Sequence, residues 1–155
     1  MYIIQECPNE IEIEKEAMDC TASTEYGIQN VFPCTKAINK NPDDSWVTNG
    51  EAVGAWIRIA LDKTYLVTRI QLRHRARGRN HEKFKGIKVE FSDGAKVEHD
   101  LKDDMDMNEV PLTNIHSTDF VKITSMSHVP HPSGGKNSNN GFSDIRIFGC
   151  VPSKC

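Results

Sequence analysis

A short basic stretch holds the most concentrated chemistry in this sequence. Residues 73–85, RHRARGRNHEKFK, contain four arginines, two histidines and two lysines against one glutamate, in a chain of 155 residues with a net charge of −3. Guanidinium groups bind carboxylates and sulfates through paired hydrogen bonds, and imidazoles bind hydroxyl groups or metals. The stretch is therefore compatible with a nucleic-acid contact, a metal site, a loop that captures an anionic ligand, or a solvated hairpin without a ligand.

Nucleic acid is the least favoured of these partners. Proteins that grip single strands combine basic charge with several stacking aromatic side chains, and the stretch offers only Phe84. The chain as a whole is also slightly acidic. We therefore expect no nucleic-acid partner.

Other motifs with chemical potential are weak. The HVPH motif at 128–131 contains proline, which excludes the helical face that would align two histidines on one metal. The acidic run DDMDMNE at 103–109 lacks the glycine and the final glutamate of an EF-hand loop. No nucleophile elbow, zinc-protease motif or acid/base pair of carboxylates is recognisable. The sequence predicts a domain that is not an enzyme.

The elements that must position the basic stretch are strands. Apolar and polar residues alternate with the period of two that is typical of half-buried strands, and turn residues such as Asp93-Gly94 end the runs. Only the acidic segment 9–19 has a weakly helical pattern. No apolar run approaches the roughly 18 residues needed to cross a bilayer, so we expect no membrane insertion. The pattern predicts one all-β domain, an antiparallel sandwich or barrel, with strands within 55–61, 65–74, 86–94, 120–126 and 144–151.

The cysteines indicate an oxidising environment. The five lie toward the two ends of the chain without any C-x-x-C pair, at Cys7, Cys20, Cys34, Cys150 and Cys155. This distribution is typical of disulfides that tie the ends of a secreted domain, so we expect an extracellular location. An odd count leaves one thiol over. Cys155, the last residue, is the candidate for an interchain bridge in a homo-oligomer.

Four segments in order resemble one family. They are KAINKNPDDSWVTNG at 36–50, GAWIRIALDKTYLVTRIQLRHR at 54–75, FKGIKVEFSDG at 84–94, and FVKIT followed by NNGFSDIRIFGC at 139–150. Together they are similar to discoidin or coagulation-factor C-type domains, which are galactose-binding-like. The resemblance implies a jelly-roll β-sandwich over 20–150, preceded by an N-terminal extension at 1–19 and followed by a tail at 151–155.

The resemblance also implies disulfides and a metal. The chain ends of this fold lie together, which suits a bridge from Cys7 to Cys150 or Cys155. Cys20 and Cys34 flank the first loop and suit a second bridge, although the connectivity stays open. Many such modules hold a structural calcium, and the matching ligands here are Asn39, Asp44 and Asp144. Asn39 and Lys40 depart from the Asp-Gly that the family often has, which weakens this predicted site.

In the resembled family, loops at one rim of the sandwich bind the ligand. This places the basic stretch in a candidate site for a glycan or glycoprotein, with a preference for acidic sugars. The function predicted is therefore that of a lectin-like or cell-adhesion module. The alternative is an extracellular structural protein that assembles through protein contacts and an interchain disulfide. The candidate ligand-binding residues are His74, Arg75, Arg77, Arg79, His81 and Lys83, with Asn137, Asn139 and Asn140 opposite.

Overall fold

The structure is a computed structural model that describes residues 6–27, 31–79, 81–130 and 139–152. Two short 3-10 turns, η1 (Lys15–Ala17) and η2 (Cys34–Ala37), accompany the strands. No helix in these ranges is long and apolar enough to cross a membrane. The strands are β1 (Ile11–Glu12), β2 (Met18–Ala22), β3 (Trp46–Val47), β4 (Trp56–His74), β5 (Gly86–Phe91), β6 (Lys96–Asp100), β7 (Asn108–Val110), β8 (His116–Ser125) and β9 (Gly141–Cys150).

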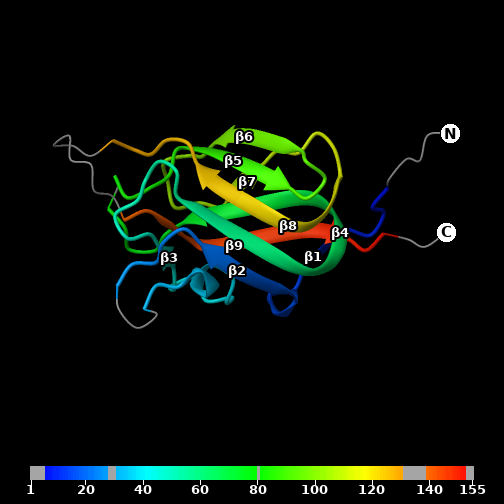
Figure 1. The fold of residues 1–155 in the computed structure, drawn as a ribbon, viewed down its shortest axis with the longest axis horizontal. Coiled ribbons are helices and arrows are strands. Elements are labelled where there is room, and N and C mark those ends of the chain that lie inside the picture. Colours follow the sequence, from blue (N-terminus) through cyan, green and yellow to red (C-terminus); the bar gives the residue numbers. More distant parts are fainter. Residues whose placement is uncertain (1–5, 28–30, 80, 131–138, 153–155) are drawn as a thin grey trace.

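Strand β4 belongs to both layers of the sandwich. Its first half pairs with β2 and β8, and its second half pairs with β9 and β7. Every pairing is antiparallel, and the main path through the sheet runs β1-β9-β4-β8-β5-β6. Figure 1 shows the first half of β4 and β8 lying in front of β9. The predicted antiparallel β-sandwich is confirmed, and the two predicted strands 55–61 and 65–74 form one bent strand.

The period-two pattern sorts the side chains of β4 between core and solvent. Ile57 and Ile59 are fully buried, while Trp56 and Arg58, which alternate with them, are only partly buried on the outer face. Because successive side chains of a strand point to opposite faces, this alternation sets the register of β4 against its neighbours.

An aromatic cluster fills one end of the core. Trp46, Phe84 and Phe142 are almost completely buried, and their ring centroids lie 5.0 to 6.0 Å apart. The indole Nε1 of Trp46 donates a hydrogen bond of 3.0 Å to the carbonyl of Thr24. Burying a tryptophan requires such a partner for its N–H. The cluster supports the end of the sandwich from which the 75–85 loop leaves.

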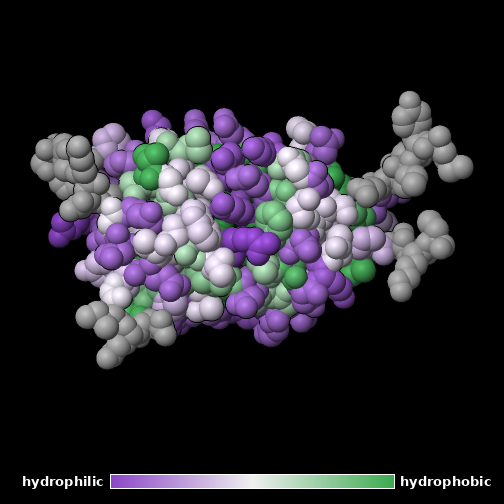
Figure 2. Space-filling model, viewed as in Figure 1, coloured by the Kyte–Doolittle hydropathy of each residue, from purple (hydrophilic) through white to green (hydrophobic). Residues whose placement is uncertain are grey.

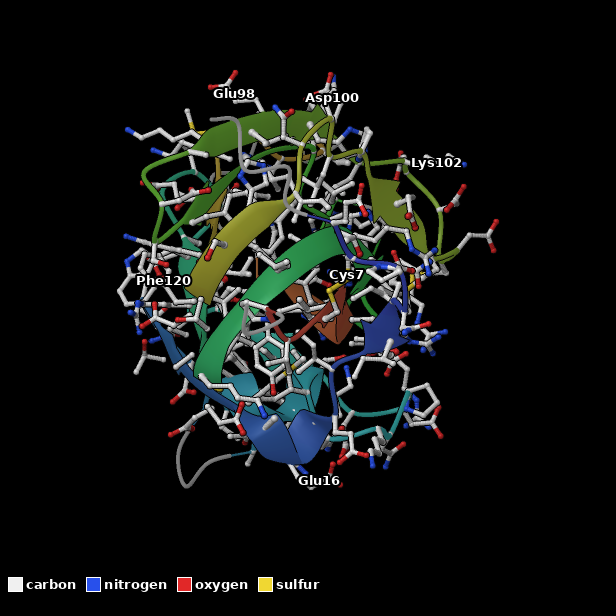
Figure 3. The ribbon with its side chains drawn as sticks, turned by 90° about the vertical axis from the view of Figure 1, so that its right-hand side faces the viewer. Cys7, Glu16, Glu98, Asp100, Lys102 and Phe120 are labelled. Carbon is white, nitrogen blue, oxygen red and sulfur yellow. A yellow bond between two sulfur atoms is a disulfide. The ribbon has the colours of Figure 1, made fainter. Side chains whose placement is uncertain are left out.

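Two disulfides connect segments that are distant in sequence. Cys7 bonds Cys150 with a Cα separation of 5.8 Å, and Cys20 bonds Cys34 with 6.1 Å. Figure 3 shows the Cys7 bridge beside β1, near the chain ends. The second predicted bridge is confirmed, and of the two predicted partners of Cys7 the structure has Cys150. Cys155 lies outside the described residues.

Part of the segment predicted as an N-terminal extension lies within the sandwich. Ile11 and Glu12 pair with β9, and Ile13 is 1% exposed and hydrogen-bonds to the Ile147 carbonyl. The helical interpretation of segment 9–19 is therefore wrong, apart from the single 3-10 turn η1. Isoleucine alternates with glutamate at 10–14, a period of two that the surrounding acidic residues obscured.

The basic segment 69–88 and the acidic segment 98–109 contact each other in the fold. Arg69 on β4 pairs at 3.5 Å with Glu109 on the neighbouring strand β7. Lys83 and Asp103, in the loops that follow β4 and β6, pair at 3.3 Å. The uneven charge along the sequence is thus partly neutralised within the fold.

Close backbone packing between β3 and β9 generates a first prediction. A Cβ atom at Gly141 would collide with the carbonyl of Trp46 on the neighbouring strand. We expect Gly141→Ala to lower the free energy of unfolding by about 1–3 kcal/mol, because the backbones must move apart. Urea denaturation measures this loss, and Thr124→Ala on the outer face of β8 is the control. Equal stability of the two variants would contradict the close packing.

Candidate functional site

The basic stretch leaves the end of β4 and enters a loop at the edge of the sandwich. This end lies opposite the N and C termini (Figure 1). Hydrogen bonds join the loop to its neighbours: the backbone N–H of Ala76 donates to Ser45 Oγ at 2.8 Å, and that of Arg75 donates to the Gly141 carbonyl at 3.0 Å. We call residues 75–79, 81–82, 48–54 and 139–140 at this end the rim.

His74 lies in the interior rather than on the rim. The side chain is 1% exposed, and Nε2–H donates to the Lys102 carbonyl at 2.8 Å. Burial lowers the pKa of His74, since desolvation disfavours the imidazolium. Nδ1 has no hydrogen-bond partner among the described residues. His74 therefore supports the base of the loop and is inaccessible to a large ligand.

Arg75 and Glu82 close the loop. The Arg75 guanidinium pairs with Glu82 at 3.1 Å and donates to the Asn139 carbonyl at 2.7 Å. The other Glu82 oxygen accepts the backbone N–H of Arg79 at 2.9 Å. A Cβ at Gly78 would approach the Arg75 side chain at 2.8 Å, so the loop folds tightly over it. Glu82, the only acid in the stretch, was not predicted as a site residue, although its isolation among cations was a usable signal.

The remaining predicted residues divide between structural contacts and solvent. Lys83 is buried and pairs with Asp103. Asn139 Oδ1 accepts the N–H of Gly50 at 2.8 Å, and the carbonyl of buried Asn140 accepts the N–H of Thr48 at 2.7 Å. These bonds connect 48–54 to the start of β9. Asn137 lies outside the described residues.

Arg77 and Arg79 are the predicted residues that project freely. Both are exposed, and neither guanidinium has a carboxylate partner in the part of the chain that the structure describes. Arg77 has a φ of 59°, a left-handed conformation that turns the loop back on itself. His81 is partly buried beside them. The structure thus presents two exposed cations on a braced loop, and such guanidinium groups can bind carboxylates, sulfates or paired hydroxyls.

The two carboxylates among the predicted calcium ligands, Asp44 and Asp144, have cationic partners. Asp44 Oδ2 accepts from Asn39 Nδ2 at 2.7 Å and pairs with Lys36 at 3.2 Å. These contacts, the Asn39 bond first, lower the pKa of Asp44. Asp144 pairs with Lys15 at 3.1 Å and with Arg146 at 2.9 Å. No group of three or more His, Cys, Asp or Glu residues gathers as a metal site within the described ranges. Lys36, Lys15 and Arg146 thus contact the carboxylates that the predicted calcium site requires, and this arrangement does not fit a calcium shell.

The fold and rim define a β-sandwich of the kind that presents a ligand-binding surface on its loops. The F5/8 type C domain family matches residues 19–145, and the chain belongs to this family. No relative was found among curated protein sequences.

Several solved structures share the fold. The family 32 CBM of Clostridium perfringens NanJ, in complex with galactose, has a TM-score of 0.73 and 18% identity, covering 90% of this chain and 98% of that chain. CpGH89CBM32-5 of C. perfringens, in complex with GalNAc-β-1,3-galactose, has a TM-score of 0.71 and 16% identity, with coverages of 88% and 99%. The lectin domain of lectinolysin, complexed with Lewis b antigen, has a TM-score of 0.66 and 20% identity, covering 91% of this chain and 100% of that chain.

Burial of His74 generates a prediction about pH. Its folded pKa lies below the unfolded value of 6.5, so unfolding takes up a proton between the two values. The stabilisation by neutral His74 is present above pH 6.5 and is lost as the pH falls through the folded pKa. We expect His74→Gln to lose less stability than wild type between about pH 7.5 and about pH 5.5, measured by urea unfolding. The same loss in both proteins would contradict this assignment.

The cationic partners of Asp44 and Asp144 generate a prediction about calcium. A metal ion would have to displace Lys36 and Lys15, so we expect the same Tm in excess CaCl2 and in EDTA. Thermal unfolding followed by circular dichroism checks this. A Tm that rises with calcium, and no longer does so in Asp44→Asn, would instead support the calcium site predicted from the sequence.

Proposed function

We propose that this domain is a non-catalytic module that binds carbohydrate through the loops of the rim. The braced basic loop is the observation that carries the proposal, because it presents Arg77 and Arg79 without carboxylate partners among the residues that the structure describes. Support comes from the solved structures with the same fold that hold galactose, GalNAc-β-1,3-galactose and Lewis b. Bonds such as Gly50 N–H to Asn139 Oδ1 hold neighbouring loops in place before a ligand arrives.

The chemistry of the exposed groups favours acidic glycans. A guanidinium donates two parallel hydrogen bonds to a carboxylate or sulfate, and this charge-assisted contact is stronger than one to a neutral hydroxyl. Arg77 and Arg79 lie two residues apart on one turn, so one acidic sugar can reach both. The Arg75–Glu82 pair holds the turn, and we assign these two residues to positioning rather than to ligand contact.

We propose that the domain acts outside the cell, and the two disulfides support this. Two bridges suit an oxidising compartment, where the domain would meet cell-surface or matrix glycans as a secreted lectin or adhesion module. Assembly through protein contacts, the alternative expected from Cys155, predicts no glycan binding.

A glycan array tests the proposal. We expect signals for sialylated, uronic or sulfated glycans that exceed those of their neutral counterparts. The triple variant Arg77→Ala, Arg79→Ala, His81→Ala should weaken Kd by about tenfold or more, the scale of losing charge-assisted contacts. As a control, the variant Lys63→Ala, Lys96→Ala removes two exposed cations elsewhere on the surface and leaves the rim intact.

The outcomes separate the parts of the proposal. Binding to neutral glycans alone, lost in the triple variant, would retain the rim site and remove the acidic preference. No binding to any glycan, with or without calcium, would leave the assembly function in its place.

A further inference from the structure

A second cluster of positive charge lies on the outer face of the sandwich, away from the rim. It consists of Trp56 and Arg58 on β4 with Phe120 and Lys122 on β8, all partly buried. We call these four residues the cation–aromatic face. Figures 1 and 2 look onto the outer side of these strands, and Figure 2 shows purple, strongly hydrophilic side chains across its middle. In Figure 3, Phe120 points outward from the sheet.

Strand register brings the two cations together. Arg58 lies directly opposite Lys122 in the β4–β8 ladder. Directly opposed side chains have Cβ atoms about 5 Å apart, and like charges at such positions repel each other. Nothing in the packing of β4 against β8 requires two cations at this pair, since both side chains face away from the core.

Aromatic rings hold both cations in place. The Arg58 guanidinium carbon lies 4.3 Å from the ring centroid of Phe120, and Lys122 Nζ lies 4.9 Å from that of Trp56. Each contact is a cation–π interaction that runs diagonally between the strands. The rings reduce the rotamer freedom of the two cations, so a ligand that binds them loses less entropy.

Neither cation is neutralised by a carboxylate of the described chain. Glu90 lies opposite Lys122 on the β5 side, but its ion pair is with Lys88 at 3.5 Å. Arg69, whose guanidinium also stacks on a ring, has Glu10 at 2.9 Å. Arg58 and Lys122 have ring contacts without such an acid. An external anion that lies between them would relieve their repulsion.

We propose that the cation–aromatic face binds a sulfated polysaccharide. The face offers two adjacent cations, Arg58 and Lys122, which suits a chain that carries closely spaced anionic groups. A protein partner would need an apolar interface core as well. The exposed large apolar side chains among the described residues lie elsewhere, at Ile11, Tyr26, Val31, Val53, Met105, Met126 and Val151. The faces of Trp56 and Phe120 are covered by the two cations.

Binding to heparin, used as the sulfated probe, tests this proposal. We expect wild type to bind, and Arg58→Gln, Lys122→Gln to raise Kd about tenfold, with elution from a heparin column at lower salt. The charge-preserving variant Arg58→Lys, Lys122→Arg should bind as wild type does. Because the rim is itself proposed to bind sulfated glycans, the comparison is repeated in the Arg77→Ala, Arg79→Ala background. The heparin binding that remains there, and its loss on adding Arg58→Gln, Lys122→Gln, reports on the cation–aromatic face alone.

Three results would overturn the proposal. The first is that wild type does not bind heparin at low salt. The second is that the double variant Arg58→Gln, Lys122→Gln binds heparin as tightly as wild type does. The third is that wild type binds poly-L-glutamate as tightly as heparin and that the double variant weakens both equally. The last result would assign the face to an acidic polypeptide. Circular dichroism and Tm check that each variant is folded. We expect all of them to fold, because none of the substituted side chains is in the core.

Discussion

Strand β4 is the constraint on which the sandwich depends. Its 19 residues carry the hydrogen bonds to β2, β8, β9 and β7, so both layers take their register from one continuous segment. The buried side chains of Ile57 and Ile70 lie on its two halves. A slip of one residue would turn these side chains to solvent and the charged ones inward. The same register places His74 at the base of the rim and Arg58 opposite Lys122.

Positive charge has three different roles within short distances on this molecule. Arg75 is structural, since its ion pair with Glu82 closes the loop. Arg77 and Arg79 project from that loop and carry the proposed glycan contact. Arg58 stacks on the Phe120 ring at the outer face of the sheet, where the proposal is that it binds a different anion. The surroundings of a cation therefore decide its function, because a nearby carboxylate neutralises it and an aromatic ring does not.

The basic stretch was expected to form a loop at one end of the sandwich, and the structure has it there. That this loop binds a ligand stays a prediction, and the surroundings of its residues differ from those expected. His74 and Lys83 were expected at the ligand, and both are buried with partners on the 102–103 loop. Lys102 lies 28 positions from His74, and Asp103 lies 20 positions from Lys83. Sequence spacing does not reveal that β7 brings this loop back to β4. For the same reason Asp144 was a predicted metal ligand, although Lys15, distant in sequence, pairs with it.

The sequence by itself determined the all-β class and the main strands, because alternation and turn residues act over short ranges. The cysteine positions indicated disulfides, but the choice of Cys150 over Cys155 as the partner of Cys7 came only from the structure. It did not determine the role of each charged residue. Tertiary structure decided that Arg75 is a brace, that His74 is a buried neutral imidazole, and that Arg58 and Lys122 are neighbours. Electrostatic energy depends on distance and burial, and both are set only when strands far apart in sequence come into register.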